Sequence, residues 1–100
     1  MQTVSLKIVT IIAETVLADK IAGDLMRLGA KGYTVTEARG EGSRHLRAGE
    51  IPGQNIKIES VVSELVAARI VDHVAQEYFS HYAVIVYVSD VAVVRGEKYI

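Results

Sequence analysis

The spacing of apolar residues alternates between two periods along the chain. Residues 4–13 are mostly apolar and β-branched, which is typical of a strand, and residues 31–39 return to that character. Between these two segments, apolar side chains recur at steps of four, four and three, at Leu17, Ile21, Leu25 and Leu28. This spacing places them on one face of a helix, so we expect a helix over 15–28, with Gly29 just past its end.

The second half of the chain repeats the same order. Residues 55–63 alternate as a strand, residues 64–79 carry apolar residues four apart, and residues 82–89 are again strand-like. We expect a short edge strand over 91–94, and the last six residues are expected to form a tail. Two strand–helix–strand units in one short chain predict an α+β, ferredoxin-like βαββαβ sandwich. Its four-stranded sheet would carry both helices on one face.

The last main strand is apolar on both of its sides. Val84 and Val86 would lie on one face, and Ile85 and Tyr87 on the other. Strands that are buried on both faces show this pattern. Two helices cover only one face of a four-stranded sheet, and an exposed apolar face is typical of an interface. We therefore expect an oligomer of identical chains, with a sheet that curls over its own loops as the alternative.

The composition excludes several classes of protein. A net charge of −1 gives no general attraction to nucleic acid or anionic lipid, and the absence of cysteine excludes disulfides, thiolate metal sites and cysteine nucleophiles. The first residues lack the apolar region of a signal peptide, and no apolar run approaches the ~18 residues of a membrane span. We expect one cytoplasmic domain over 1–100, without nucleic-acid binding or membrane insertion.

A long loop over 40–54 separates two good strands. Loops of this length in a compact domain are usually functional or disordered. Its glycines allow close backbone approach, and successive N–H groups near them can hold an anion. Ser43 adds a hydroxyl, while Arg44 and Arg47 supply forked donors that match phosphate or carboxylate. These features predict a phosphate cradle, with a solvated connector as the alternative; neither a Walker loop nor a dinucleotide fingerprint is present.

This loop and its flanks resemble the PII signalling family. The resemblance is carried by the run Gly29-Ala30-Lys31-Gly32-Tyr33-Thr34-Val35-Thr36-Glu37, by Gly40 and Gly42, and by Lys57-Ile58-Glu59. It covers nearly the whole chain in order and spacing. The short loop and the run Tyr78-Phe79-Ser80-His81-Tyr82-Ala83 are most similar to PII-like proteins linked to inorganic-carbon acquisition, the SbtB-type and carboxysome-associated (CPII) branch.

The resemblance implies a homotrimer in which the free face of each sheet turns toward the threefold centre. It implies that ADP or AMP binds between subunits, with ATP or cyclic AMP as alternatives and bicarbonate as a second ligand. The long loop, called the T-loop in this family, would change its order with the ligand. It would then contact a protein partner, a bicarbonate transporter or a carboxysome component, and so signal inorganic-carbon and energy status.

The resemblance also assigns residues to the nucleotide site. The adenine pocket would be lined by Gly32, Tyr33 and Thr34, and bordered from the neighbouring strand by Glu59, Ser60 and Val61. The ribose and phosphates would be held by Gly40, Gly42, Ser43 and Arg44, with Arg47 reaching the phosphates. A second loop would close on the nucleotide through His81, Tyr82 and Ala83. The segment of about 91–100, which crosses to a neighbouring subunit in this family, contributes Arg95 and Lys98. Bicarbonate is expected at Gly42, Ser43 and Arg44.

The chain departs from ordinary PII proteins in three respects. Its T-loop has no tyrosine that could be uridylylated, and the basic phosphate-binding loop is replaced by Tyr82-Ala83, which favours ADP or AMP over ATP. Arg44 and Asn55 stand near the places of the residues that serve Mg-ATP and 2-oxoglutarate in those proteins, which speaks against 2-oxoglutarate sensing.

Other functions leave recognisable patterns. An acylphosphatase-type enzyme needs an arginine in the loop after its first strand, but that turn is Ala13-Glu14-Thr15. The histidines lack metal-ligand spacing, and His73 is expected to be a packing or surface residue, so we expect no metal and no catalytic residues. An RNA-binding sheet needs more exposed aromatic residues than this chain has. A regulatory module that binds an amino acid between subunits remains the alternative.

Overall fold

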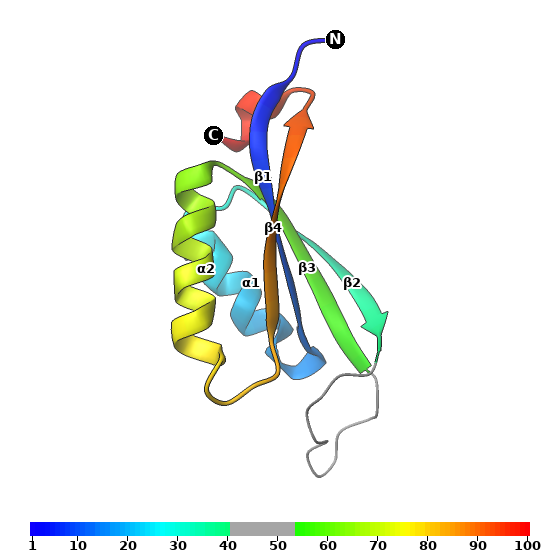
Figure 1. The fold of residues 1–100 in the computed structure, drawn as a ribbon. Helices are drawn as coiled ribbons and strands as arrows, with labels where there is room; N and C mark the ends of the chain where they lie inside the picture. The colour runs from blue at the N-terminus through cyan, green and yellow to red at the C-terminus, as the bar shows by residue number, and fades with distance from the viewer. Residues whose placement is uncertain (41–53) are drawn as a thin grey trace.

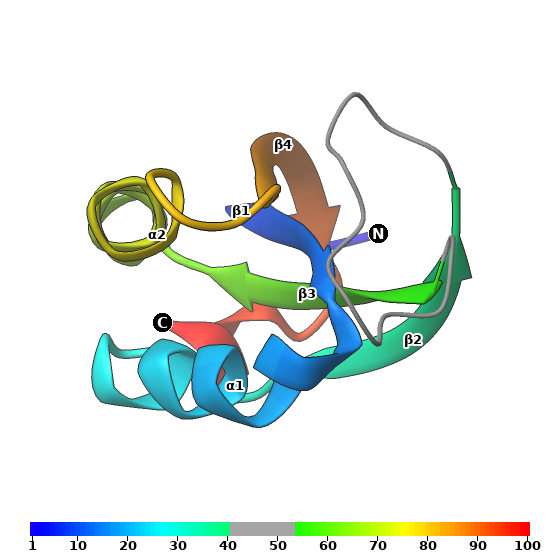
Figure 2. The same cartoon turned by 90° about the horizontal axis from the view of Figure 1, so that it is seen from below.

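The computed structural model describes residues 1–40 and 54–100. Four strands form one antiparallel sheet in the order β2-β3-β1-β4: β1 is Val4–Glu14, β2 is Thr34–Arg39, β3 is Gln54–Val62 and β4 is Ile85–Val93. The helices α1, Ala18–Arg27, and α2, Glu64–Tyr78, lie on the same face of this sheet (Figures 1 and 2). The predicted α+β, ferredoxin-like fold is therefore confirmed.

The core lies between the helices and the sheet. In the antiparallel register, Ile11 of β1 faces Ile58 of β3, and both side chains are fully buried. They pack with Ile21 and Leu25 of α1 and with Ile70 of α2. Each buried side chain of this size contributes roughly 1.5–3 kcal/mol. The helical and strand-like spacings read from the sequence thus converge on one apolar layer.

The ends of the helices follow local signals. Ser63 precedes α2, and its Oγ accepts a hydrogen bond from the backbone N–H of Val66 at 3.2 Å. Gly29 ends the first helical segment with φ of +116°, a left-handed conformation that favours glycine. The helix expected over 15–28 is not uniform, because Thr15–Leu17 forms a 3₁₀ turn, η1, before α1 begins.

Two expectations about the C-terminal part are wrong. The strands expected over 82–89 and 91–94 are one strand, β4, because β1 is long enough to pair with all of it, from Ile12 opposite Ile85 to Val4 opposite Val93. Lys7 forms an ion pair with Asp90, which accommodates an acidic residue within that strand. The last six residues are not a plain tail either, since Gly96–Tyr99 forms a 3₁₀ helix, η2.

The face of the sheet opposite the helices carries apolar side chains. The register places Ile12 of β1 opposite Ile85 of β4 and Thr10 of β1 opposite Tyr87, and Val61 of β3 faces Ile8. Ile85 is 54% exposed and Tyr87 is 46% exposed in the single chain. The strands are thus apolar on both sides, as the sequence predicts. No helix among the described residues has the length and apolar character to cross a membrane.

Candidate ligand pocket

A pocket of about 530 Å³ opens where three strands and η2 meet. The strand register builds its floor, because Thr34 of β2 lies opposite Glu59 of β3, and Val61 of β3 lies opposite Ile8 of β1. The short segment before β2 and the helix η2 complete the wall. The full lining is Ile8, Lys31, Gly32, Tyr33, Thr34, Glu59, Ser60, Val61, Lys98 and Tyr99.

The pocket combines apolar, aromatic and charged groups. Tyr33 and Tyr99 supply rings from two different segments, while Ile8 and Val61 supply aliphatic surface. Aromatic rings and aliphatic side chains suit a planar base, for which stacking on one ring contributes roughly 1–3 kcal/mol. The ammonium groups of Lys31 and Lys98 outnumber the single carboxylate among the lining residues. The pocket is therefore chemically suited to an anionic ligand that carries a planar ring.

All six residues that the family resemblance assigned to the adenine pocket and its border lie together here, with Lys98 of the C-terminal segment beside them. The six are Gly32, Tyr33, Thr34, Glu59, Ser60 and Val61. Sequence reasoning missed Ile8, Lys31 and Tyr99. Lys31 lies inside the resembling run and could have been found there. Ile8 reaches the pocket only through its register with β3, and Tyr99 only through the fold of η2.

The other assigned residues lie elsewhere. Gly40 follows β2 at its far end, beyond Arg39, and lies about 20 Å along the extended chain from Thr34, the first residue of the strand. His81, Tyr82 and Ala83 precede β4, whose first residue faces Ile12 at the same end of the sheet (Figure 1). Tyr82 also packs partly against the core. Gly42, Ser43, Arg44 and Arg47 lie outside the described residues.

Arg95 stands between β4 and η2 and is not among the lining residues. Its φ of 63° places it in the left-handed region, which is uncommon for a residue with a side chain. The next residue, Gly96, lies so close to β1 that an added Cβ would stand 2.6 Å from the Cβ of Val4. This tight turn places η2, and with it Lys98 and Tyr99, at the pocket of the same chain.

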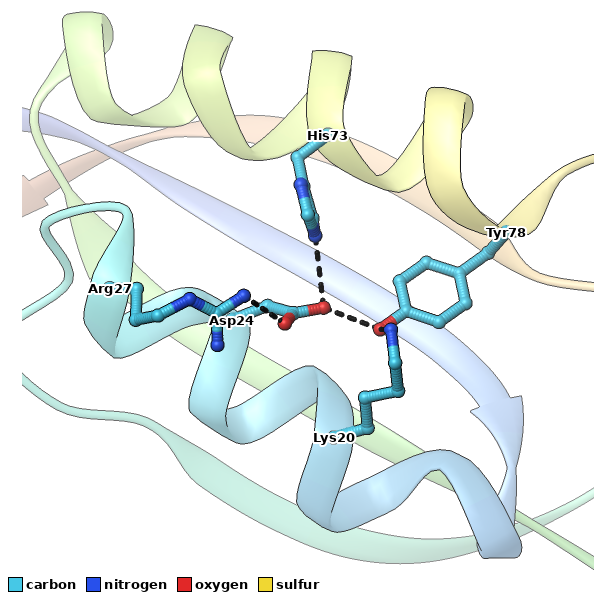
Figure 3. A network of polar contacts seen from close by, with 5 residues as sticks. All are labelled: Lys20, Asp24, Arg27, His73 and Tyr78. Carbon is cyan, nitrogen blue, oxygen red and sulfur yellow. Dashed lines mark hydrogen bonds and ion pairs between the residues drawn. The ribbon is translucent and has the colours of Figure 1, made fainter.

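A second polar cluster joins the two helices (Figure 3). Asp24 of α1 is 3% exposed, and its Oδ2 accepts a hydrogen bond from the hydroxyl of Tyr78 on α2. His73 Nε2 lies 3.0 Å from the same oxygen, and Arg27 Nη2 donates to Oδ1 at 2.5 Å. Lys20 Nζ donates to the Tyr78 hydroxyl at 3.1 Å and lies 4.6 Å from the centre of its ring.

These contacts shift the pKa values of Asp24, Tyr78 and Lys20. Burial by itself raises the pKa of Asp24, but the hydrogen bonds from Tyr78, Arg27 and His73 outweigh burial, so the pKa falls below the usual 3.8. Burial and the hydrogen bond to Asp24 raise the pKa of Tyr78, which stays a donor. The hydrogen bond to Tyr78 raises the pKa of Lys20. The cluster is thus a charged acceptor surrounded by donors.

The cluster corrects one expectation from the sequence. We expected a simple packing or surface role for His73, yet its ring makes a specific polar contact with Asp24 of the other helix. Because Asp24 is buried and accepts from donors on both helices, the pair has a structural role in holding α1 against α2. Among the residues that the structure describes, no three potential metal ligands gather at one place.

The fold and the pocket define a small ferredoxin-like protein with a candidate ligand pocket formed by β1, β2, β3 and η2. The family described as nitrogen regulatory protein P-II matches residues 6–98. A chain from Thermus thermophilus, described as a PII-like signalling protein, is similar at 57% identity over 100% of both chains, with a TM-score of 0.87.

CPII from Thiomonas intermedia K12 is similar to this chain in several structures. The structure bound to ADP, AMP and acetate is 27% identical over 99% of this chain and 98% of that chain, with a TM-score of 0.84. The structure bound to ADP and bicarbonate is 28% identical over the same shares, also with a TM-score of 0.84. The chain described here belongs to the P-II family, whose members are signalling regulators and not enzymes.

Proposed function

We propose that this PII-like protein binds ADP or AMP in clefts between the subunits of a homotrimer. The observation that carries the proposal is the pocket at β1, β2 and β3, where the residues assigned to adenine meet aromatic, aliphatic and cationic side chains. CPII, which is similar over nearly the whole chain, was solved with ADP and AMP bound. ATP and cyclic AMP are the alternative adenine nucleotides.

The residues assigned to the nucleotide lie in two groups at opposite ends of the sheet, which supports a site between subunits. Within one chain, Gly40 and His81 lie at the far end of the sheet from Thr34. A single nucleotide that contacts both groups needs the pocket of one chain and the loop end of another. The apolar face around Ile85 and Tyr87 provides the surface through which identical chains would associate. The expected trimer would therefore complete the site.

The proposed signal combines the nucleotide with bicarbonate. CPII was also solved with ADP and bicarbonate. We expect Gly42, Ser43 and Arg44 to bind the bicarbonate, because an arginine fork matches a small planar anion. Each ligand would favour the same arrangement of the T-loop, residues of about 40–54, and so raise the affinity for the other. The ordered loop would contact a protein partner in the cytoplasm, a bicarbonate transporter or a carboxysome component.

Isothermal titration calorimetry tests the ligands. The full chain is titrated with ADP, AMP, ATP and cyclic AMP, each with and without bicarbonate, and with a panel of amino acids. We expect ADP or AMP to bind most tightly, and bicarbonate to raise that affinity. Equal affinities with and without bicarbonate would remove the coupling. Binding of an amino acid, without any adenine nucleotide, would replace the nucleotide proposal with the amino-acid alternative.

Light scattering coupled to gel filtration tests the assembly. Three chains of 10.9 kDa give a particle of about 33 kDa. Tyr87→Asp places a charge on the open face of the sheet and should yield monomers. Leu65→Asp is the matched control, because Leu65 is 63% exposed on α2, on the helix side of the molecule. A monomeric wild-type chain, or an unchanged Tyr87→Asp trimer, would contradict the proposed interface.

A further inference from the structure

Ser60 is a polar residue at a position of β3 where the alternation of the strand predicts a buried apolar side chain. Along β3, Ile56, Ile58, Ser60 and Val62 share the buried face, and Ser60 is 2% exposed. A buried hydroxyl is unfavourable unless it forms a hydrogen bond. Here the Oγ of Ser60 donates to the backbone carbonyl of Gly32 at 2.6 Å. This bond therefore explains why a serine is accommodated in the core-facing row of β3.

The bond holds the segment that forms one wall of the ligand pocket. This segment joins α1 to β2 and contains no helix or strand residues between Ala30 and Tyr33. At its start, the Ala30 N–H donates to the carbonyl of Leu25 at 3.0 Å, and at its end the ladder with β3 begins at Thr34. The hydrogen bond from Ser60 fixes the peptide midway between these two points.

Neither backbone conformation nor steric contact within the chain requires a glycine at position 32. Its φ is not in the positive range that favours glycine, and a Cβ added there would meet no heavy atom within 4 Å. By contrast, Gly29 has positive φ and Gly96 is in tight contact with β1. The missing side chain at Gly32 instead leaves bare backbone at the pocket. Bare backbone allows close approach by another molecule.

We infer that Ser60 is a positioning residue for the nucleotide site, acting through Gly32. Its hydroxyl is engaged by the Gly32 carbonyl and does not itself contact the ligand. It holds the Gly32 peptide so that the side without a side chain forms a flat wall, against which the planar base lies. This role rests on the proposed nucleotide binding. Loss of the bond would leave the wall free to shift, and a less preorganised wall lowers affinity.

The test compares three variants of the full chain by calorimetry with ADP and with GDP. Ser60→Ala removes the donor and should lower ADP affinity about tenfold, the effect expected for losing one well-formed hydrogen bond. It should also reduce the preference for ADP over GDP, since the wall contacts the base. Ser60→Thr keeps the hydroxyl and should restore both values. Ser5→Ala is the control, because Ser5 is an exposed serine of β1 that lies away from this pocket.

Gly32→Ala provides an independent measurement, which remains informative if Ser60→Ala folds poorly. It retains the hydrogen bond from Ser60 and should leave the thermal unfolding temperature unchanged, because the added methyl meets no atom of the chain. It should nevertheless weaken ADP binding strongly, since the methyl occupies the place of the base.

The outcomes separate two failures. If the wild-type chain binds no adenine nucleotide, the proposed function fails, and the role of Ser60 fails with it. If the wild-type chain binds ADP but a folded Ser60→Ala variant matches its affinity and its preference over GDP, only the role of Ser60 is overturned. Wild-type ADP affinity in a folded Gly32→Ala variant would likewise overturn the proposed wall.

Discussion

Replacing Tyr78 with phenylalanine tests the contact that links the two helices. The substitution removes one hydroxyl and retains the ring, which is 1% exposed and packs in the core. The Oδ2 atom of Asp24 then loses the hydrogen bond from the Tyr78 hydroxyl, while His73 remains near the same oxygen. No cavity is created, so the change isolates the hydrogen bond from the packing of the ring.

The expected loss is about 2 kcal/mol of unfolding free energy. A hydrogen bond to a charged group contributes roughly 1.5–3 kcal/mol, and the carboxylate of Asp24 is too buried for water to replace the donor fully. Lys20 adds little, because its ammonium group lies at the surface. For a domain of this size, about 2 kcal/mol corresponds to a fall in the unfolding temperature of roughly 8–16 °C.

Urea unfolding followed by circular dichroism gives the unfolding free energy, at one protein concentration for all variants because assembly affects stability. A double-mutant cycle with Asp24→Asn measures the coupling between the two groups. Ser5→Ala is the control, because it also removes one hydroxyl group but from an exposed residue of β1. A Tyr78→Phe variant within about 0.5 kcal/mol of the wild type would refute the structural role of the cluster.

Three other substitutions or conditions test separate parts of the fold. Gly96→Ala should lower the unfolding free energy by about 1–3 kcal/mol in urea, because the new Cβ would stand 2.6 Å from Val4, and wild-type stability would contradict this contact. Ser63→Ala should cost about 1 kcal/mol by the same measurement, since the cap of α2 is lost, whereas Ser63→Asp should retain it. Hydrogen bonds hold the pKa of Asp24 below 3.8 despite its burial, so the unfolded state binds the proton first as the pH falls. The stability advantage over Asp24→Asn should persist above pH 3.8 and decline below it, and an advantage that grows on acidification would contradict the cited direction.

The sequence predicted the order of helices and strands because that information is local. Spacings of two and of about 3.6 residues identify strands and helices without knowledge of their partners. The expected break before 91–94 was wrong because Asp90 resembles a strand end when it is viewed alone. Its ion pair with Lys7, on a strand more than eighty residues away, supplies the missing context. The length of a strand depends on its neighbour, which a local pattern does not contain.

In the candidate site too, locally recognisable residues could be predicted from the sequence, whereas residues placed by distant contacts could not. The adenine-side residues were named from a resemblance, and their convergence in one pocket depends on the register between β2 and β3. Ile8 and Tyr99 were missed because neither has a local signal. Ile8 reaches the pocket through the register of β1 with β3, and Tyr99 reaches it through the turn at Gly96. The contact between Asp24 and His73 joins two helices whose relative position no residue spacing in the chain determines.

The two faces of the sheet are covered in different ways, so substitutions on one face should affect folding stability and substitutions on the other should affect ligand binding. The helix-side face is closed within one chain by the core and by the Asp24 cluster. The open face exposes Ile85 and Tyr87 and includes the pocket beside Val61. Substitutions in the cluster should therefore lower stability and leave the ADP affinity of the folded protein unchanged. Substitutions on the open face should change assembly and affinity together, because the proposed site needs two chains.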